Sequence, residues 1–145
     1  RIPLVPALAA AAPALALGHA IGRIGCFLVG DDYGRPTDLP WGVAFPRGLP
    51  PTTVPVHPAQ LYEAAGLAVV AWLLLRWRRA GAADVVVFGR YLILAGALRF
   101  VIEFIRVNDQ VAGPLTLAQL FSVAIMAVGL WFIRSRAKNR RRAGR

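Results

Sequence analysis

The sequence contains a single cysteine, Cys26. One thiol cannot form an intramolecular disulfide, and it leaves no cysteine cluster for a structural zinc site. The composition therefore excludes a small secreted module held together by disulfides. It does not indicate whether the protein works in an oxidising or a reducing compartment.

Acidic residues are also few. Seven Asp and Glu stand against 17 Lys and Arg, which gives a formal net charge of +10. A strongly basic chain usually binds nucleic acid or an anionic lipid surface. Seven of the basic residues lie in the last twelve positions, 134–145, directly after an apolar run. Membrane proteins carry cytoplasmic anchor charges in this place, so the pattern favours membrane lipids as partners and argues against nucleic acid.

Charge is absent from four stretches of the chain, and 57% of its 145 residues are hydrophobic. A helix needs about 20 apolar residues to cross a hydrocarbon core of ~30 Å. A capping box, Thr116 with Gln119, marks the start of the last stretch. We therefore predict an all-α integral membrane protein with four transmembrane helices, near Leu4–Val29, Ala59–Trp77, Val85–Ile105 and Leu115–Ile133.

The segment between the first two helices, Gly30–Pro58, is rich in Gly, Pro, Asp and Thr, which predicts an extramembrane or re-entrant loop. If both termini lie inside, the inner side receives twelve of the 17 basic residues, as the positive-inside rule requires. The tail 134–145 is then inside and the loop outside. Acidic and basic residues are mixed in the outer half, and we expect the chemistry there.

Small residues in the first two helices predict a bundle in which helices approach closely. They are Gly18 and Gly22 in the first helix and Ala64, Ala65, Gly66 and Ala68 in the second. The chain also enters an apolar, proline-broken stretch directly after Arg1. Because this stretch does not resemble a signal peptide, we expect the chain to be a fragment of a longer protein.

Arg99, Glu103 and Arg106 have the i, i+4, i+7 spacing that places residues on one face of a helix, here near the outer end of the third. Ionisable groups at membrane depth cost at least ~2.5 kcal/mol each and face a bundle interior or a cavity. Two explanations remain open. Either Arg99 pairs with Glu103 between helices while Arg106 extends to the headgroups, or the guanidiniums bind a phosphate-bearing ligand.

His19, Arg23 and Cys26 repeat this spacing on the first helix. Gly22 and Gly25 flank Arg23, so a neighbouring backbone or a ligand can come close to the guanidinium. The alternative is a pair of packing glycines beside an arginine with an ordinary partner. Cys26 fits a small buried apolar residue better than a catalytic thiol.

Two further groups of polar residues flank the outer loop. Asp31 and Asp32, close to Arg35, are typical of an ordinary polar turn. His57 stands just before the second helix, which also carries Glu63. A histidine in this place either makes a capping or loop contact or takes part in proton transfer near neutral pH.

Taken in order, six short motifs resemble the C-terminal part of the bacterial prolipoprotein diacylglyceryl transferase family. The resemblance covers about Gly18–Ser122. The motifs are Gly22-Arg23-Ile24-Gly25 with Phe27, Tyr33-Gly34-Arg35-Pro36-Thr37, Trp41-Gly42-Val43-Ala44-Phe45-Pro46, His57-Pro58 with Gln60-Leu61-Tyr62-Glu63, Arg99-Phe100 with Glu103-Phe104 and Arg106, and Leu115-Thr116 with Gln119.

The resemblance implies an enzyme of the bacterial inner membrane that uses no metal and no cofactor. Such an enzyme transfers the diacylglyceryl group of phosphatidylglycerol to the thiol of the lipobox cysteine in a lipoprotein precursor. Glycerol phosphate is released, and the site opens to the periplasm and the bilayer. Its implied partners are phosphatidylglycerol, the lipoprotein precursor and membrane lipids.

The resemblance also implies roles for individual residues. The expected catalytic residues are Arg23, Arg99, Glu103 and His57, with His57 as a candidate acceptor for the thiol proton. The expected substrate-binding residues are Arg23, Arg35, Glu63, Arg99 and Arg106.

The chain departs from the family pattern at four positions: Cys26 and Val29 replace Asn, Asp31 replaces Glu, and Ala95 replaces Tyr. It also has no counterpart of a His-Gly-Gly motif that belongs to the family's N-terminal spans. A second hypothesis therefore stays open, a non-catalytic membrane module that binds an anionic lipid headgroup. A small transporter is a more distant third.

Overall fold

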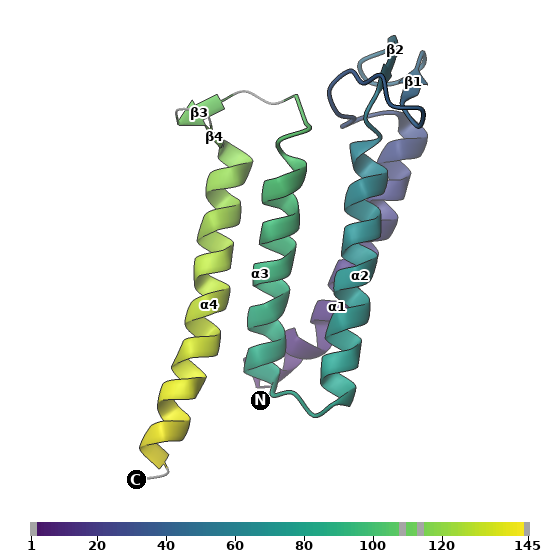
Figure 1. The fold of residues 1–145 in the computed structure, drawn as a ribbon. Helices are drawn as coiled ribbons and strands as arrows, with labels where there is room; N and C mark the ends of the chain where they lie inside the picture. Colours follow the sequence, from purple (N-terminus) through teal and green to yellow (C-terminus); the bar gives the residue numbers. More distant parts are fainter. Residues whose placement is uncertain (1–2, 108–109, 113–114, 144–145) are drawn as a thin grey trace.

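The computed structural model describes residues 3–107, 110–112 and 115–143, so that Asp109, Gly113 and Pro114 lie outside the described residues. The chain forms four helices, α1 (Leu4–Val29), α2 (Ala59–Arg79), α3 (Asp84–Ile102) and α4 (Leu117–Ala143). All four are long and apolar enough to cross a membrane. In Figure 1 they run alongside one another, with α1 beside α2 and α3 beside α4. The prediction of an all-α membrane protein is confirmed.

Two small sheets lie at one end of the bundle, which we call the loop end (Figure 1). In the predicted loop, β1 (Val43–Phe45) pairs antiparallel with β2 (Thr52–Val56). Between α3 and α4, β3 (Gln110–Ala112) pairs with β4 (Leu115–Thr116). Both termini lie at the opposite end, as an even number of crossings requires (Figure 1).

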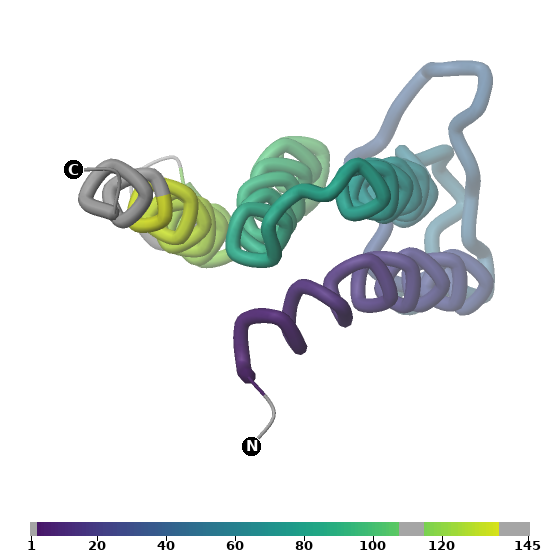
Figure 2. The backbone as a smooth tube through the Cα atoms, turned by 90° about the horizontal axis from the view of Figure 1, so that it is seen from below, coloured from purple at the N-terminus to yellow at the C-terminus, as the bar shows by residue number. Residues whose placement is uncertain are grey.

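The first helix is shaped by a proline and ended by a glycine. Pro13 lies inside α1 and removes a backbone donor. In Figure 2 the N-terminal turns of α1 diverge from α2, and Ala9 and Ala12 share a core cluster with Val87 of α3. At the other end Gly30 has φ +75°, and its N–H donates to the Cys26 carbonyl at 2.9 Å.

The small residues that bring helices together are only partly the predicted ones. Gly18 and Gly22 face open space on α1, whose alanines pack on α2 instead. The closest approach joins α3 to α4, where a Cβ at Gly129 would lie 2.6 Å from the Gly89 carbonyl oxygen. Glycine is required at this crossing because the two backbones touch.

Helix boundaries differ from the expected ones at α3 and α4. The third helix ends at Ile102, not Ile105. Beyond it the backbone hydrogen-bonds to the loop between α1 and α2, because the Ile105 carbonyl accepts from the Arg35 N–H at 2.8 Å. Arg106 therefore lies beyond the helix, paired with Gly34 in a β-bridge. The prediction that Arg106 occupies a face of the third helix is wrong.

The start of α4 follows the predicted capping box. The Thr116 N–H donates to Gln119 Oε1 at 3.0 Å, and the Gln119 N–H donates to Thr116 Oγ1 at 3.3 Å. These reciprocal bonds satisfy two donors that a helix start leaves without partners. The helix then continues to Ala143, beyond the expected end at Ile133 and into the segment expected to form the tail.

Candidate functional site

Arg23 is a buried cation near the loop end of α1, with 7% of its surface exposed. Its Nε lies 3.0 Å from Oε2 of Glu63, which α2 contributes and which is 3% exposed. The pair is close, although the N–H is not aligned as a hydrogen bond. Burial of either charge alone would be costly, so each stabilises the other. Gly22 and Gly25 leave open space next to the helix backbone here.

Asp32 carries a second carboxylate to Arg23 from the loop. Its φ of +58° is left-handed, a conformation that aspartate tolerates better than most residues. Oδ2 accepts from Arg23 Nη1 at 3.0 Å, and Oδ1 accepts from Arg106 Nη2. Partial burial opposes ionisation, but the hydrogen bonds from both guanidiniums outweigh it and hold the pKa of Asp32 below its ordinary value. No sequence pattern distinguishes this aspartate from one in an ordinary polar turn.

Glu103, the residue directly after α3, lies close to Arg99, Arg106 and Thr116. Its Oε2 lies 2.9 Å from Arg99 Nη2 and 4.0 Å from Arg106 Nε. The Thr116 hydroxyl, at the start of α4, donates to Oε1 at 2.8 Å. The three residues that the i, i+4, i+7 spacing singled out are therefore together, although only Arg99 lies within the helix.

These contacts make one row of alternating charges through the loop end of the bundle. Three carboxylates separate three guanidiniums, so the row is formally neutral. Neutrality explains how six ionised groups are accommodated in a membrane protein. The row runs Glu63, Arg23, Asp32, Arg106, Glu103, Arg99.

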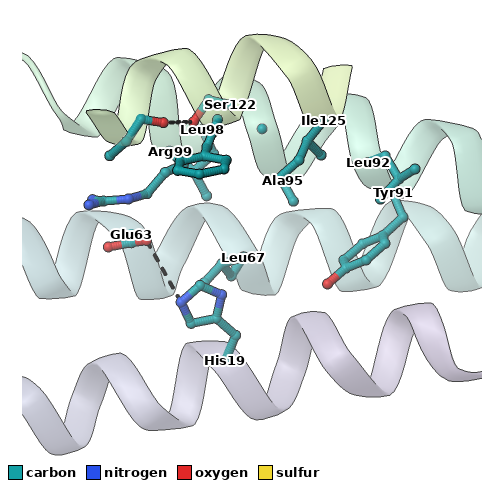
Figure 3. A pocket seen from close by; sticks show the side chains of 13 residues that line it. His19, Glu63, Leu67, Tyr91, Leu92, Ala95, Leu98, Arg99, Ser122 and Ile125 are labelled. Carbon is teal, nitrogen blue, oxygen red and sulfur yellow. Dashed lines mark hydrogen bonds and ion pairs between the residues drawn. The ribbon is translucent and has the colours of Figure 1, made fainter. Parts of the chain in front are cut away.

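The two ends of this row meet at a pocket of about 340 Å³. Figure 3 shows Glu63 and Arg99 at one end of it and Tyr91 at the other, with His19 on α1 facing Glu63. Apolar side chains such as Leu67 and Ile125 form most of its wall. Its size is within the usual ~300–1,000 Å³ of small-molecule sites.

Two guanidinium nitrogens of the row remain available: one belongs to Arg99, which lines the pocket, and one to Arg23, whose partner Glu63 lines it. Arg99 Nη1 and Arg23 Nη2 are buried and have no hydrogen-bond partner among the described residues. Native proteins pair most buried donors, so such atoms point to a ligand. A pocket with guanidinium donors at one end and an apolar wall fits a molecule with an anionic head and a hydrocarbon body.

Comparison with known families agrees with this geometry. The chain matches the family described as prolipoprotein diacylglyceryl transferase over residues 1–135. It belongs to this family. The resemblance seen in the motifs is confirmed.

Several named relatives are similar over most of this chain. A protein from Geobacter sulfurreducens is 42% identical over 128 residues, 82% of this chain and 46% of that protein. One from Solidesulfovibrio magneticus is 39% identical over 135 residues, covering 87% and 49%. One from Cupriavidus metallidurans is 41% identical over 126 residues, covering 81% and 45%. All three are named phosphatidylglycerol–prolipoprotein diacylglyceryl transferase, and the chain spans about half their length.

Of the expected family site residues, Glu63 and Arg99 line the pocket, and Arg23, Glu103 and Arg106 belong to the row beside them. Arg35 and His57 belong to neither. Arg35 is exposed in the loop, and its Nε donates to the Arg106 carbonyl at 3.3 Å. The His57 ring lies 3.4 Å from the Tyr62 hydroxyl, which accepts from Trp41 Nε1 at 2.7 Å. Both residues secure the loop against α2 and the end of α3. The role of His57 as a base stays a prediction.

The four residues that depart from the family pattern lie next to the charged row, at the exposed end of α1 or on the pocket wall. Cys26 Sγ lies 3.5 Å from Arg23 Nη1, and the Asp31 carbonyl accepts from the Gln60 side-chain amide. Val29 is exposed at the end of α1. Ala95 lines the pocket, one turn from Tyr91, which lines it too. A tyrosine hydroxyl is therefore present in this pocket, about one helical turn deeper than the family pattern leads one to expect.

The ligand atoms of Cys26, Asp31 and Asp32 lie within 4.8 Å of one another. Both Asp32 oxygens already accept from guanidiniums, whose positive charges oppose a cation. The cluster therefore fits an anchor for Arg23 and Arg106 better than a metal centre.

Proposed function

We propose that the protein is a phosphatidylglycerol–prolipoprotein diacylglyceryl transferase. It would move diacylglyceryl from phosphatidylglycerol to the lipobox cysteine thiol of a lipoprotein precursor and release glycerol phosphate. One observation carries the proposal: Arg99, whose buried Nη1 has no hydrogen-bond partner among the described residues, lines an apolar pocket together with Glu63, the ion-pair partner of the buried Arg23. The names of the relatives support it.

The phosphate is the part of the lipid that the charged row suits. Arg23 Nη2 and Arg99 Nη1 have no hydrogen-bond partner in the described part of the chain, and guanidiniums bind phosphate oxygens through paired, charge-assisted hydrogen bonds. When the glyceryl carbon–oxygen bond breaks, negative charge grows on the leaving phosphate. Fixed donors in a water-poor site stabilise that charge, and one such donor is typically worth ~10²–10³ in rate.

The carboxylates hold these donors in place. Glu63 fixes Arg23 from α2, and Glu103 fixes Arg99 while its other oxygen accepts from the hydroxyl of Thr116. The guanidiniums are thereby positioned before the lipid arrives, and little reorganisation is needed during the reaction. The diacyl chains would lie along the apolar wall, which includes Leu67 and Leu92.

We further propose that the loop end faces the periplasm, with the termini on the cytoplasmic side of the inner membrane. Twelve of the 17 basic residues then lie inside, among them Arg76, Arg78 and Arg79 at the end of α2. An exported precursor would meet the charged row from the periplasm.

The full-length protein in phosphatidylglycerol vesicles tests the proposal, with a lipobox peptide as acceptor. We expect the peptide to gain diacylglyceryl and an equal amount of glycerol phosphate to appear. A peptide with Ser in place of its cysteine is the control, since it offers no thiol. Saturable binding of phosphatidylglycerol without transfer to the cysteine peptide would contradict the enzyme and support a lipid-binding module.

A further inference from the structure

His19 is a histidine on the wall of the pocket between Glu63 and Tyr91. It lies on α1 one turn before Arg23, and its Nε2 is 3.8 Å from Oε1 of Glu63 (Figure 3). Its side chain is 52% exposed, and it lines the pocket together with Glu63 and Arg99. His57, the other histidine of the chain, lies in the outer loop instead.

Glu63 links this histidine to the charged row. One of its oxygens faces His19 and the other lies 3.0 Å from Arg23 Nε. A carboxylate near Nε2 favours the imidazole form with its hydrogen on that nitrogen, which leaves the lone pair on Nδ1. The same carboxylate stabilises the imidazolium that forms when Nδ1 takes up a proton.

The reaction needs such a group. Sulfur attacks as the thiolate, and an ordinary cysteine thiol is mostly protonated at neutral pH. Of the pocket-lining residues in the described part of the chain, His19 is the one whose side-chain type exchanges protons near neutrality. The others with ionisable groups are Glu63, paired with Arg23, together with Arg99 and Tyr91.

We propose that His19 accepts the proton of the acceptor thiol and that Glu63 positions its ring. This inference rests on the proposed transferase activity. The S–H bond breaks and the proton goes to the imidazole. Sulfur then bonds to the glyceryl carbon as the carbon–oxygen bond to phosphate breaks, and that electron pair leaves with glycerol phosphate. The imidazolium returns its proton to the released phosphate or to water, which completes the cycle.

The charges around His19 are compatible with this role. Arg23 on its own helix and Arg99 on α3 oppose an added positive charge, whereas Glu63 on α2 favours it. The described pocket residues of α4, among them Ser122 and Ile125, are uncharged. In this proposal the guanidiniums of Arg23 and Arg99 bind the phosphate, and the carboxylate of Glu63 stabilises the imidazolium of His19.

The test compares wild type, His19→Gln and His19→Gly in the full-length protein, with phosphatidylglycerol vesicles and a lipobox peptide from about pH 5 to 9. We expect His19→Gln to lower kcat by about 10²–10⁴-fold with KM for the lipid unchanged. The fall in rate at low pH should disappear. Added imidazole should restore part of the activity of His19→Gly, which a purely structural role cannot explain.

Three results would overturn the inference. An unchanged kcat in His19→Gln, with wild type active, would remove His19 and leave the transferase in place. Loss of the low-pH fall in His57→Gln but not in His19→Gln would assign the proton to the loop histidine. No transfer by folded wild type would overturn both the transferase and the role of His19.

Discussion

Asp32 and Arg106 form an ion pair that ties the loop after α1 to the segment after α3, 74 positions along the chain. Asp32 also accepts from Arg23, so one loop carboxylate holds two guanidiniums of the charged row. It is the most exposed carboxylate of the three, at 44% of its side chain. A bound phosphate adds negative charge to a neutral row. Because Asp32 is the most exposed carboxylate, it can most easily release its hydrogen bonds with the guanidiniums to the phosphate.

Asp32→Asn should therefore strengthen binding of phosphatidylglycerol relative to a zwitterionic lipid. The change gives the row a net charge of +1 and weakens the competition for both guanidiniums. Because the pair is partly exposed, we expect about 0.5–1 kcal/mol, or roughly two- to fivefold in affinity. Equilibrium binding to vesicles of each lipid measures it. Equal affinities in the variant and wild type would show that Asp32 does not compete with the headgroup.

Asp32 should also make the free energy of unfolding depend on pH in the acidic range. The pKa of Asp32 is lower in the folded protein than in the unfolded chain, where it is about 3.9, so its contribution is fully present well above that value. It is lost as pH falls through the lower folded pKa. Thermal unfolding in detergent between about pH 2 and 6 should show a smaller acid effect in Asp32→Asn than in wild type. The same loss of stability in both proteins would contradict the ion pairs.

Arg99→Lys should separate phosphate binding from folding. Lysine keeps a charge near Glu103 but replaces the planar fork with a single ammonium, so the free Nη1 donor is lost. We expect a folded protein with a large loss of phosphatidylglycerol binding. Lipid binding and thermal unfolding are measured together. Unchanged binding would mean that Arg99 serves only to pair with Glu103.

Glu103→Gln should instead damage the fold. Glu103 is 3% exposed, and its removal leaves Arg99 and Arg106 close together without the carboxylate that separates them. Removing one partner of a buried pair typically costs about 3–5 kcal/mol. The stability of the purified protein in denaturant checks this. A variant as stable as wild type would contradict the row of alternating charges.

Gly129→Val should destabilise the contact between α3 and α4, because a Cβ there would lie 2.6 Å from the Gly89 carbonyl oxygen. Gly18→Val is the matched control, since a Cβ at Gly18 meets nothing within 4 Å among the described residues. The temperature of thermal unfolding in detergent should fall in the first variant and stay close to that of wild type in the second. Equal losses in the two variants would contradict this packing.

Much of the fold follows from local sequence patterns. The charge-free stretches predict four helices because a hydrocarbon core excludes charge over the length of a span. The capping box of Thr116 and Gln119 is local as well, and it formed as predicted. The spacing of Arg99 and Glu103 is helical, and their ion pair lies where that spacing requires.

The remaining features depend on contacts between distant segments. The end of α3 is set by the loop backbone at Arg35, so no helix signal near Ile105 marks it. The role of Asp32 depends on a left-handed backbone at that residue. Gly18 and Gly22 have the familiar packing spacing but face open space, whereas Gly89 and Gly129 meet across two helices. Sequence spacing within one helix does not reveal the partner on another.

The transfer rate of Arg23→Ala, compared with that of a matched arginine variant, tests the role of the buried guanidiniums in transfer. The control is Arg76→Ala, at the other end of the bundle, where the guanidinium lies over the Trp72 ring. The readout is diacylglyceryl transferred from phosphatidylglycerol to a lipobox peptide by the full-length protein. We predict a fall of at least ~10²-fold for Arg23→Ala and a rate near wild type for Arg76→Ala. A folded Arg23→Ala protein that transfers at the wild-type rate would contradict the account.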